Sequence, residues 1–234
     1  MVRREAGAQA RRGSAALRWM IGVGLAMVVV AGSGYASANP GGPILGFTGA
    51  PGEAFTGDAS CTYGPGFGCH ESFAANSPLG TLTIEGPSSY ELGMTYLITV
   101  DVAQEGQARW GFQLTVLDEL LQRAGTLAST DADESTQIQN TLPPRQYVAH
   151  SLAGTAPGQP NENSWSFQWT APDTDVGPVT FYAAGNAANN DGASAGDYIY
   201  TTTATVPEPG SLAAGLLALF TAAALARRRS GRPA

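Results

Sequence analysis

Strict alternation of apolar and polar side chains in two stretches of the chain restricts those stretches to β-strands. Residues 110–116 read Trp-Gly-Phe-Gln-Leu-Thr-Val, and residues 164–170 read Ser-Trp-Ser-Phe-Gln-Trp-Thr. A period of two places the apolar side chains on one face of a strand. The predicted core faces consist of Trp110, Phe112, Leu114 and Val116 in the first stretch, and of Trp165, Phe167 and Trp169 in the second.

Other segments rich in apolar and β-branched residues recur between turn signals. The predicted strands are Thr81–Glu85, Thr95–Val102, Trp110–Leu117, Gln146–Leu152, Ser164–Thr170, Pro178–Ala184 and Asp197–Val206. Only Leu117–Arg123 has a helical pattern, and it is short. Seven or eight strands separated by long polar loops predict an all-β fold, an antiparallel β-sandwich.

The N-terminal segment, residues 1–38, has the three parts of a secretory signal peptide. Arginines between Arg3 and Arg18 precede an apolar run that starts at Trp19, and Ala36-Ser37-Ala38 forms a small-residue cleavage site. The run is short for a membrane span, and no stop-transfer charges follow it. We expect export by the general secretory route and cleavage after Ala38. An uncleaved anchor is one alternative, and the Arg11-Arg12 pair suggests twin-arginine export as another.

The C-terminal segment, residues 206–234, combines a Pro-Glu-Pro motif, an apolar run and a basic end. Val206-Pro207-Glu208-Pro209-Gly210 is followed by the apolar stretch Ser211–Ala226 and then by Arg227-Arg228-Arg229. The prolines predict an extended junction ahead of a helix. The arginines predict a membrane helix with its basic end in the cytoplasm, so that residues 39–205 form one secreted domain outside. A plain C-terminal anchor with a Pro-rich linker is the alternative.

This order of motif, helix and basic end closely resembles the PEP-CTERM sorting signal of Gram-negative bacteria. The resemblance implies that a membrane-embedded exosortase recognises Pro207, Glu208 and Pro209 and removes the tail. Signal peptidase and an exosortase-type enzyme are then the expected processing partners. The implied location is the periplasmic side of the inner membrane before processing, and the cell surface or the medium afterwards.

The central region resembles reeler-like bacterial surface domains, often labelled choice-of-anchor proteins. The matching segments are Gly49–Glu53, Cys69-His70, Trp110–Leu114, Trp165–Pro172, Gly177–Asn189 and Gly192–Asp197. The resemblance implies an immunoglobulin-like sandwich in an extracellular location. It implies no established activity, because a fold does not fix a function.

The charge distribution argues against two classes of partner. Only 13% of the residues are charged, and the formal net charge is -7. Between residues 39 and 206 the basic residues are Arg109, Arg123 and Arg145, and lysine is absent. An acidic domain without a basic patch is a poor binder of nucleic acid. It is equally unsuited to electrostatic adsorption on anionic lipid.

Cys61 and Cys69 are the two cysteines, and His70 follows the second directly. In an exported chain two such cysteines are expected to form a disulfide, and the glycines between them let the chain fold back. Covalent haem attachment through Cys61, Cys69 and His70 is an alternative, although 7 residues separate the cysteines where that motif usually has two. A zinc site that adds His150 to these three residues is a further alternative.

A Gly-rich segment near the C-terminal end of the domain carries several oxygen ligands. Asn186, Asn189, Asp191 and Asp197 could hold Ca²⁺, which prefers such ligands on flexible loops. An ordinary turn-rich loop is the alternative, because Asn, Asp and Gly tolerate positive φ. A second acidic cluster, which contains Asp131, Asp133 and Glu134, is interpreted as a solvated loop.

No pattern in the sequence indicates an enzyme. A nucleophile elbow, a carboxylate pair in an apolar setting and a phosphate-binding Gly loop are all missing from the sequence. Trp110, Trp165 and Trp169 could stack on sugars, but alternating aromatic residues are more often core. We therefore expect a non-enzymatic exported surface or matrix protein, without a resident cofactor, for adhesion or exopolysaccharide association. The alternatives are a haem or redox module and a secreted glycan-binding or glycan-hydrolysing protein.

Overall fold

The computed structural model describes residues 39–53, 70–130, 134–140 and 145–208. Nine strands and one short 3-10 helix make up the regular structure of these ranges. The strands are β1 (Gly80–Glu85), β2 (Thr95–Gln104), β3 (Arg109–Leu117), β4 (Thr126–Ser129), β5 (Thr136–Asn140), β6 (Gln146–His150), β7 (Glu162–Thr170), β8 (Val179–Ala188) and β9 (Tyr198–Val206). The 3-10 helix η1 (Ala153–Thr155) lies between β6 and β7.

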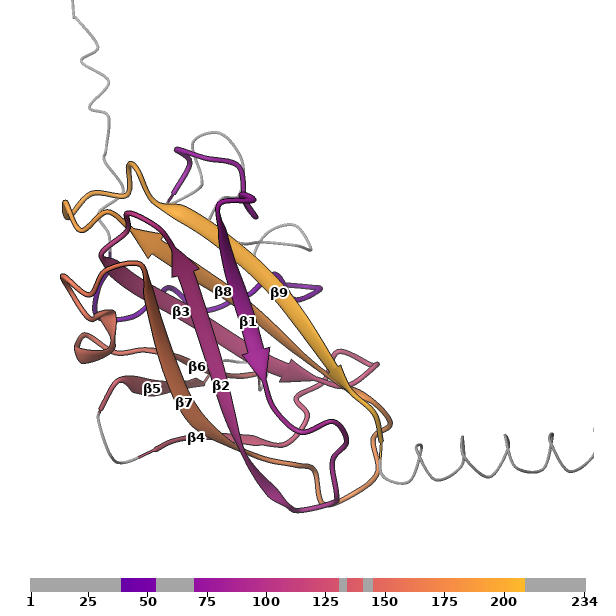
Figure 1. Cartoon of the computed structure of the whole chain (residues 1–234). Helices are drawn as coiled ribbons and strands as arrows, with labels where there is room; N and C mark the ends of the chain where they lie inside the picture. Colours follow the sequence, from indigo (N-terminus) through magenta and orange to yellow (C-terminus); the bar gives the residue numbers. More distant parts are fainter. Residues whose placement is uncertain (1–38, 54–69, 131–133, 141–144, 209–234) are drawn as a thin grey trace, which may run out of the picture. The chain divides into compact units, whose positions relative to one another are not determined.

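The strands form two sheets that pack face to face (Figure 1). One sheet has the order β1-β2-β7-β4, and the other has the order β5-β6-β3-β8-β9. Every pairing within both sheets is antiparallel. The predicted antiparallel β-sandwich is therefore confirmed, with nine strands in place of the seven or eight expected.

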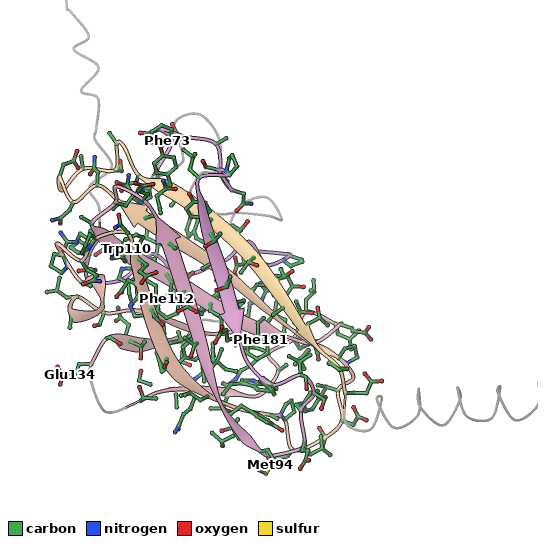
Figure 2. The ribbon with its side chains drawn as sticks, in the orientation of Figure 1. Phe73, Met94, Trp110, Phe112, Glu134 and Phe181 are labelled. Atoms are coloured by element: carbon green, nitrogen blue, oxygen red, sulfur yellow. The ribbon has the colours of Figure 1, made fainter. Side chains whose placement is uncertain are left out.

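The core lies between the sheets and is dominated by aromatic rings (Figure 2). Phe112 of β3 packs on Trp165 of β7 at a centroid distance of 4.6 Å, and Trp169 of β7 meets Phe181 of β8 edge-on at 5.0 Å. Both pairs bridge the two sheets, as aromatic pairs in tilted and edge-to-face geometry do. The alternating residues of β3 and β7 point inward, which confirms the two predicted core faces.

The three core tryptophans each satisfy their polar atom within the fold. The indole N–H groups of Trp110, Trp165 and Trp169 donate to the backbone carbonyls of Gln159, Gly154 and Ala124, at 2.8, 2.8 and 2.9 Å. All three side chains are at most 2% exposed. The alternative that they stack on sugars at the surface is wrong, because their burial in the core leaves no ring face open.

Most predicted strands are present, with shifted ends. The strand predicted over Gln146–Leu152 ends at His150, and the one predicted over Pro178–Ala184 runs on to Ala188. The short strands β4 and β5 were not expected. Both are rich in Thr, Ser, Gln and Asn and lack a run of apolar residues, so that their sequences carry little strand signal.

The helix predicted over Leu117–Arg123 is wrong, because this segment is a tight turn closed by a bridge between Leu117 and Arg123. The carboxylate of Asp118 accepts hydrogen bonds from the backbone N–H groups of Leu120 and Gln122, at 2.9 and 2.8 Å. Local bonds from an Asp side chain favour turns over helix. A helix of so few residues also gains too few backbone hydrogen bonds to offset the cost of nucleation.

Residues 39–53, which we call the strap, lie against the outer face of the five-stranded sheet. The buried side chain of Gln113 in β3 accepts a hydrogen bond from the backbone N–H of Phe47 and donates to the carbonyl of Ile44, at 3.1 and 3.2 Å. Gln137 of β5 donates to the carbonyl of Gly41 at 2.6 Å. Glutamine side chains on the outer face thus bind the strap to the sheet through its backbone.

The processing sites predicted at both ends fall mostly outside the described residues. This holds for the signal cleavage site at Ala36 and Ala38, for Pro209, and for the basic cluster Arg227, Arg228 and Arg229. Cys61 and Cys69 also lie outside them. In the ranges that the structure describes, no helix has the length and apolar character needed to cross a membrane.

Truncation of a core ring is expected to destabilise the sandwich strongly. Phe167 is fully buried on β7, opposite Ile98 of β2. Phe167→Ala should lower the free energy of unfolding by about 3–5 kcal/mol, since the cavity adds to the lost transfer energy. The control is Leu97→Ala. Leu97 precedes Ile98 on β2, and its side chain is 61% exposed, so this substitution should cost far less. Urea unfolding followed by tryptophan fluorescence measures both, and equal losses would contradict the assigned faces.

A buried carboxyl at the end of the strap predicts a pH-dependent stability. Glu53 is 4% exposed, and its oxygens accept hydrogen bonds from the backbone N–H and hydroxyl of Thr48, both at 2.7 Å, and from the backbone N–H of Ala50 at 3.2 Å. Burial raises the pKa of Glu53 above its ordinary value of 4.5, although these hydrogen bonds and Tyr147 act to lower the pKa.

Because the folded-state pKa of Glu53 is raised, the stability it contributes is fully present below pH 4.5 and is lost as the pH rises through the folded pKa. Lowering the pH from 7 toward 4.5 should therefore stabilise the natural chain relative to Glu53→Gln, which cannot titrate. Urea unfolding of both proteins across this range measures the difference. A constant difference would show that the carboxyl keeps its ordinary pKa in the folded state.

Candidate functional site

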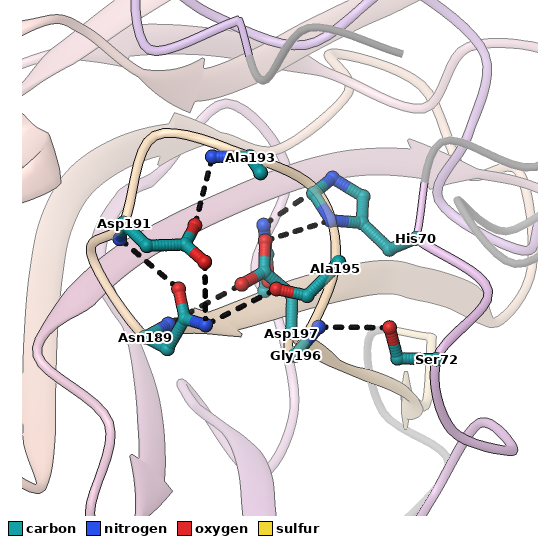
Figure 3. A network of polar contacts seen from close by, with 9 residues as sticks. His70, Ser72, Asn189, Asp191, Ala193, Ala195, Gly196 and Asp197 are labelled. Atoms are coloured by element: carbon teal, nitrogen blue, oxygen red, sulfur yellow. Dashed lines mark hydrogen bonds and ion pairs between the residues drawn. The ribbon is translucent and has the colours of Figure 1, made fainter. Parts of the chain in front are cut away.

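The connection between β8 and β9, residues 189–197, is held by its own side chains (Figure 3). The Asn189 amide donates to Asp191 Oδ2 and to the carbonyl of Ala195, both at 3.1 Å, and its Oδ1 accepts from the backbone N–H of Asp191 at 3.0 Å. Asp191 Oδ1 accepts from the backbone N–H of Ala193 at 2.8 Å. These bonds give Asn189 and Asp191 the role of turn residues.

Gly196 completes this connection in a conformation that requires glycine. Its φ is +86°, and a Cβ at this position would lie 2.5 Å from the amide nitrogen of Asn189. The backbone N–H of Gly196 donates to Ser72 Oγ at 2.7 Å. The connection is thereby joined to Ser72, two residues after His70. Asp197, the residue after Gly196, lies beside His70.

Asp197, His70 and Asn186 form a row of polar groups at the end of β8. Oδ2 of Asp197 lies 2.9 Å from Nδ1 of His70, and the two side chains are 0% and 9% exposed. The other ring nitrogen of His70, Nε2, lies 3.4 Å from the amide nitrogen of Asn186. Asp197 Oδ1 also accepts from the backbone N–H of Asn189 at 3.2 Å. The carboxylate therefore lies within ion-pair distance of the His70 ring, although the two atoms are not aligned for a hydrogen bond.

His150, at the end of β6, is the second histidine of the chain and is also buried. The ladder between β3 and β6 stops at Gln113 and Ala149, and the backbone N–H of Phe112 donates to His150 Nδ1 instead, at 3.0 Å. Burial lowers the pKa of His150, and the charge of Arg109 acts in the same direction, against hydrogen bonds with the backbone of Phe112 and Asn39. Nδ1 also lies 3.1 Å from the carbonyl oxygen of Phe112, so that the tautomer decides whether the ring accepts from the N–H or donates to the carbonyl of this residue.

The two histidines line one cavity of about 250 Å³ between the outer face of the five-stranded sheet and the strap. Asn186, Asp197 and Arg109 line the same cavity, together with apolar side chains of the strap. A cavity that combines apolar walls with a few convergent polar groups is the usual form of a small-molecule site. This cavity is therefore the candidate functional site.

The sequence-predicted calcium ligands separate into two groups in the structure. Asn189 and Asp191 are bonded within the connection, whereas Asn186 and Asp197 face His70 in the cavity. No cluster of three or more His, Cys, Asp or Glu side chains suited to a metal occurs among the residues described. The structure thus does not bring the four predicted ligands around one point.

The remaining predicted site residues are scattered or lie outside the described residues. Asp131 and Asp133 are not described, and Glu134 accepts a hydrogen bond from the hydroxyl of Ser151 through its backbone carbonyl. His70 is placed beside Asp197, while its predicted partners Cys61 and Cys69 are not described. The disulfide, haem and zinc hypotheses for these cysteines remain predictions.

Sequence reasoning missed Arg109, Gly111 and Gln113 as parts of the site. All three lie at outward positions of β3, where the alternating pattern predicts exposure, and all three line the cavity under the strap. The sequence did carry one indication of the site, which is the presence of Gly111 and Gln113 in the middle of an otherwise apolar strand. Gly in a strand interior often marks close approach of another group.

Comparison with known proteins gives only distant structural matches. No family model matches the chain, and no curated protein does so either. Similar solved structures include the cohesin module of a family 33 glycoside hydrolase from Clostridium perfringens, at 10% identity and TM-score 0.37, covering 56% of this chain and 98% of that one. The fold assignment rests on the strand pairings themselves.

Two further solved structures have similar scores. An uncharacterized protein from Nocardia farcinica with an immunoglobulin-like fold has 13% identity and TM-score 0.32, covering 54% of this chain and 97% of that one. The C-terminal domain of the Streptococcus pyogenes antigen I/II-family protein AspA has 9% identity and TM-score 0.32. That match covers 54% of this chain and 46% of that one.

Removing His70 is expected to destabilise the domain through Asp197. In His70→Ala the fully buried carboxyl would keep only the backbone N–H of Asn189, and a buried polar group left without a partner costs about 1–3 kcal/mol. The double variant His70→Ala with Asp197→Ala removes both groups and should be less destabilised than His70→Ala alone. Thermal unfolding measures both, with Asp191→Asn in the exposed loop as control. If His70→Ala unfolds at the same temperature as the natural chain, the contact between His70 and Asp197 contributes nothing to stability.

Proposed function

We propose that this chain is a non-enzymatic exported protein of the cell surface or extracellular matrix, sorted by its Pro-Glu-Pro tail. The observation that carries this proposal is the position of the last strand. β9 ends at Val206, and Pro207 and Glu208 follow it directly. The sorting motif therefore begins where the sandwich ends, at a junction where prolines prevent further pairing of the strand.

The sandwich in this proposal is a reeler-like, immunoglobulin-like domain that provides adhesion or association with exopolysaccharide. The segments that resemble such domains include the end of the strap, the core strands β3, β7 and β8, and the connection that ends at Asp197. Those in β3, β8 and the connection contribute residues to the cavity lining. The two histidines are held in place by Asp197 and by the backbone of Phe112.

A redox module based on Cys61, Cys69 and His70 is a second candidate. One observation favours it, because Asp197 lies at Nδ1 of His70, and carboxylates in that position commonly orient histidines that bind a metal through the other nitrogen. A bound haem would supply electron transfer, and His70 with Asp197 would hold and orient it.

The intact mass of the protein from its native envelope and medium tests the sorting proposal. We expect a mass that starts at Asn39, ends near Pro207-Glu208-Pro209, and gains two hydrogens on reduction of a Cys61–Cys69 disulfide. The control is a chain that ends at Val206, which keeps all nine strands and lacks the motif. Without the motif and the tail it should be exported but neither anchored nor sorted, and it should accumulate in the periplasm.

Two results would contradict these expectations. A chain that retains its tail in every fraction would refute exosortase-type sorting. A mass that carries an added haem, with the matching visible absorption band, would replace the disulfide and make the redox module the leading hypothesis.

A further inference from the structure

The cavity under the strap has a floor with one missing side chain. Gly111 of β3 lies directly opposite Asn186 of β8 in the ladder. A Cβ on Gly111 would lie 2.8 Å from Cε1 and 3.1 Å from Nδ1 of His150, closer than side chains pack. The glycine therefore lets the His150 ring lie directly on the sheet, and the cavity opens beside this ring, with Asn186 next to it in the lining.

The lining of the cavity carries a hydrogen-bonding group without a partner. One end of the Asn186 amide contacts His70 Nε2, and the other end, Oδ1, is buried and has no hydrogen-bond partner among the described residues. The amide can be turned over without changing its shape, so the free end is an acceptor in one orientation and a donor in the other. A buried group of this kind favours a ligand with a polar atom above it.

Arg109 gives the cavity a positive charge that no described carboxylate balances. Its guanidinium makes one hydrogen bond, of 3.4 Å, to Thr155 Oγ1, and the described residues contain no salt bridge to it. Arg109 lines the cavity together with His150. The carboxylate in the lining, Asp197, is already paired with His70. The local field therefore favours an anion, and a guanidinium binds carboxylates with two parallel hydrogen bonds.

The remaining walls are apolar. Pro43, Ile44 and Phe47 of the strap and Ile199 of β9 also line the cavity. The volume of about 250 Å³ exceeds the roughly 150 Å³ of an engineered cavity that binds benzene. It lies just below the range of about 300–1,000 Å³ typical of sites for drug-sized ligands. A ligand with one ring or a compact branched body fits this volume.

We propose that this cavity is a binding site for a small carboxylate with a compact apolar body. The carboxylate pairs with Arg109, and the Asn186 amide supplies a further polar contact. The apolar body packs against the strap. This inference does not depend on the sorting proposal, since the cavity lies between the five-stranded sheet and the strap and its ligand is bound whether or not the tail is processed.

Titration calorimetry with phenylacetate and with its neutral amide, phenylacetamide, tests the proposal on the purified full chain. Phenylacetate should bind, and the amide should bind at least tenfold more weakly, because a charge-assisted hydrogen bond is lost. Arg109→Gln should weaken phenylacetate binding by a similar factor. Arg123→Gln is the matched control, because Arg123 donates to Gly125 and Thr126 and does not line the cavity. This variant should bind phenylacetate as tightly as the natural chain.

Arg109→Lys keeps the charge and should retain part of the affinity, which separates loss of binding from loss of folding. Thermal unfolding of each variant accompanies the titrations. The proposal would be overturned if the natural chain bound phenylacetate and phenylacetamide with equal affinity. It would also be overturned if folded Arg109→Gln bound phenylacetate as tightly as the natural chain. Absence of phenylacetate binding at millimolar concentration in the natural chain would overturn it as well.

Discussion

Burial of both faces of β3 is the constraint on which the rest of the structure depends. Every residue of this strand from Trp110 to Leu117 is buried, although the sequence alternates. The inner residues pack against the four-stranded sheet, and the outer ones lie beneath the strap. An antiparallel sheet commonly leaves one face to water. Here the strap covers the central strand on that face, and the polar residues at outward positions must find partners within the protein.

These outward residues either find partners within the protein or line the cavity. Gln113 satisfies its amide with the backbone of the strap, and Thr115 donates its hydroxyl to the carbonyl of Gln146 at 2.9 Å. Gly111 has no side chain, and the His150 ring lies over it, where a Cβ would collide with the ring. The cavity under the strap is lined by this ring together with Arg109 and Gln113, two outward residues of β3.

The sequence predicted the strands with strong apolar periodicity and missed those without it. β3 and β7 were evident because Trp and Phe recur at alternate positions, whereas β4 and β5 gain their stability from neighbouring strands. Asn186 and Asp197 were recognised as polar ligands, but their meeting with His70 was not, since that contact requires β8, β9 and the segment before β1 to be assembled. Turn residues near the site gave a local signal, whereas the pairing of distant residues gave none.

The last hairpin carries the cavity and the Pro207-Glu208 segment, the start of the proposed sorting motif, at opposite ends of one strand. β9 begins at Tyr198, next to Asp197 in the cavity, and ends at Val206, next to Pro207. Its 9 residues span about 30 Å at roughly 3.3 Å per residue. A domain held by its tail would therefore present the cavity at the end of β9 away from the anchor. Changes at the motif and changes at the cavity should then act independently, because sites this far apart and without shared partners are usually additive.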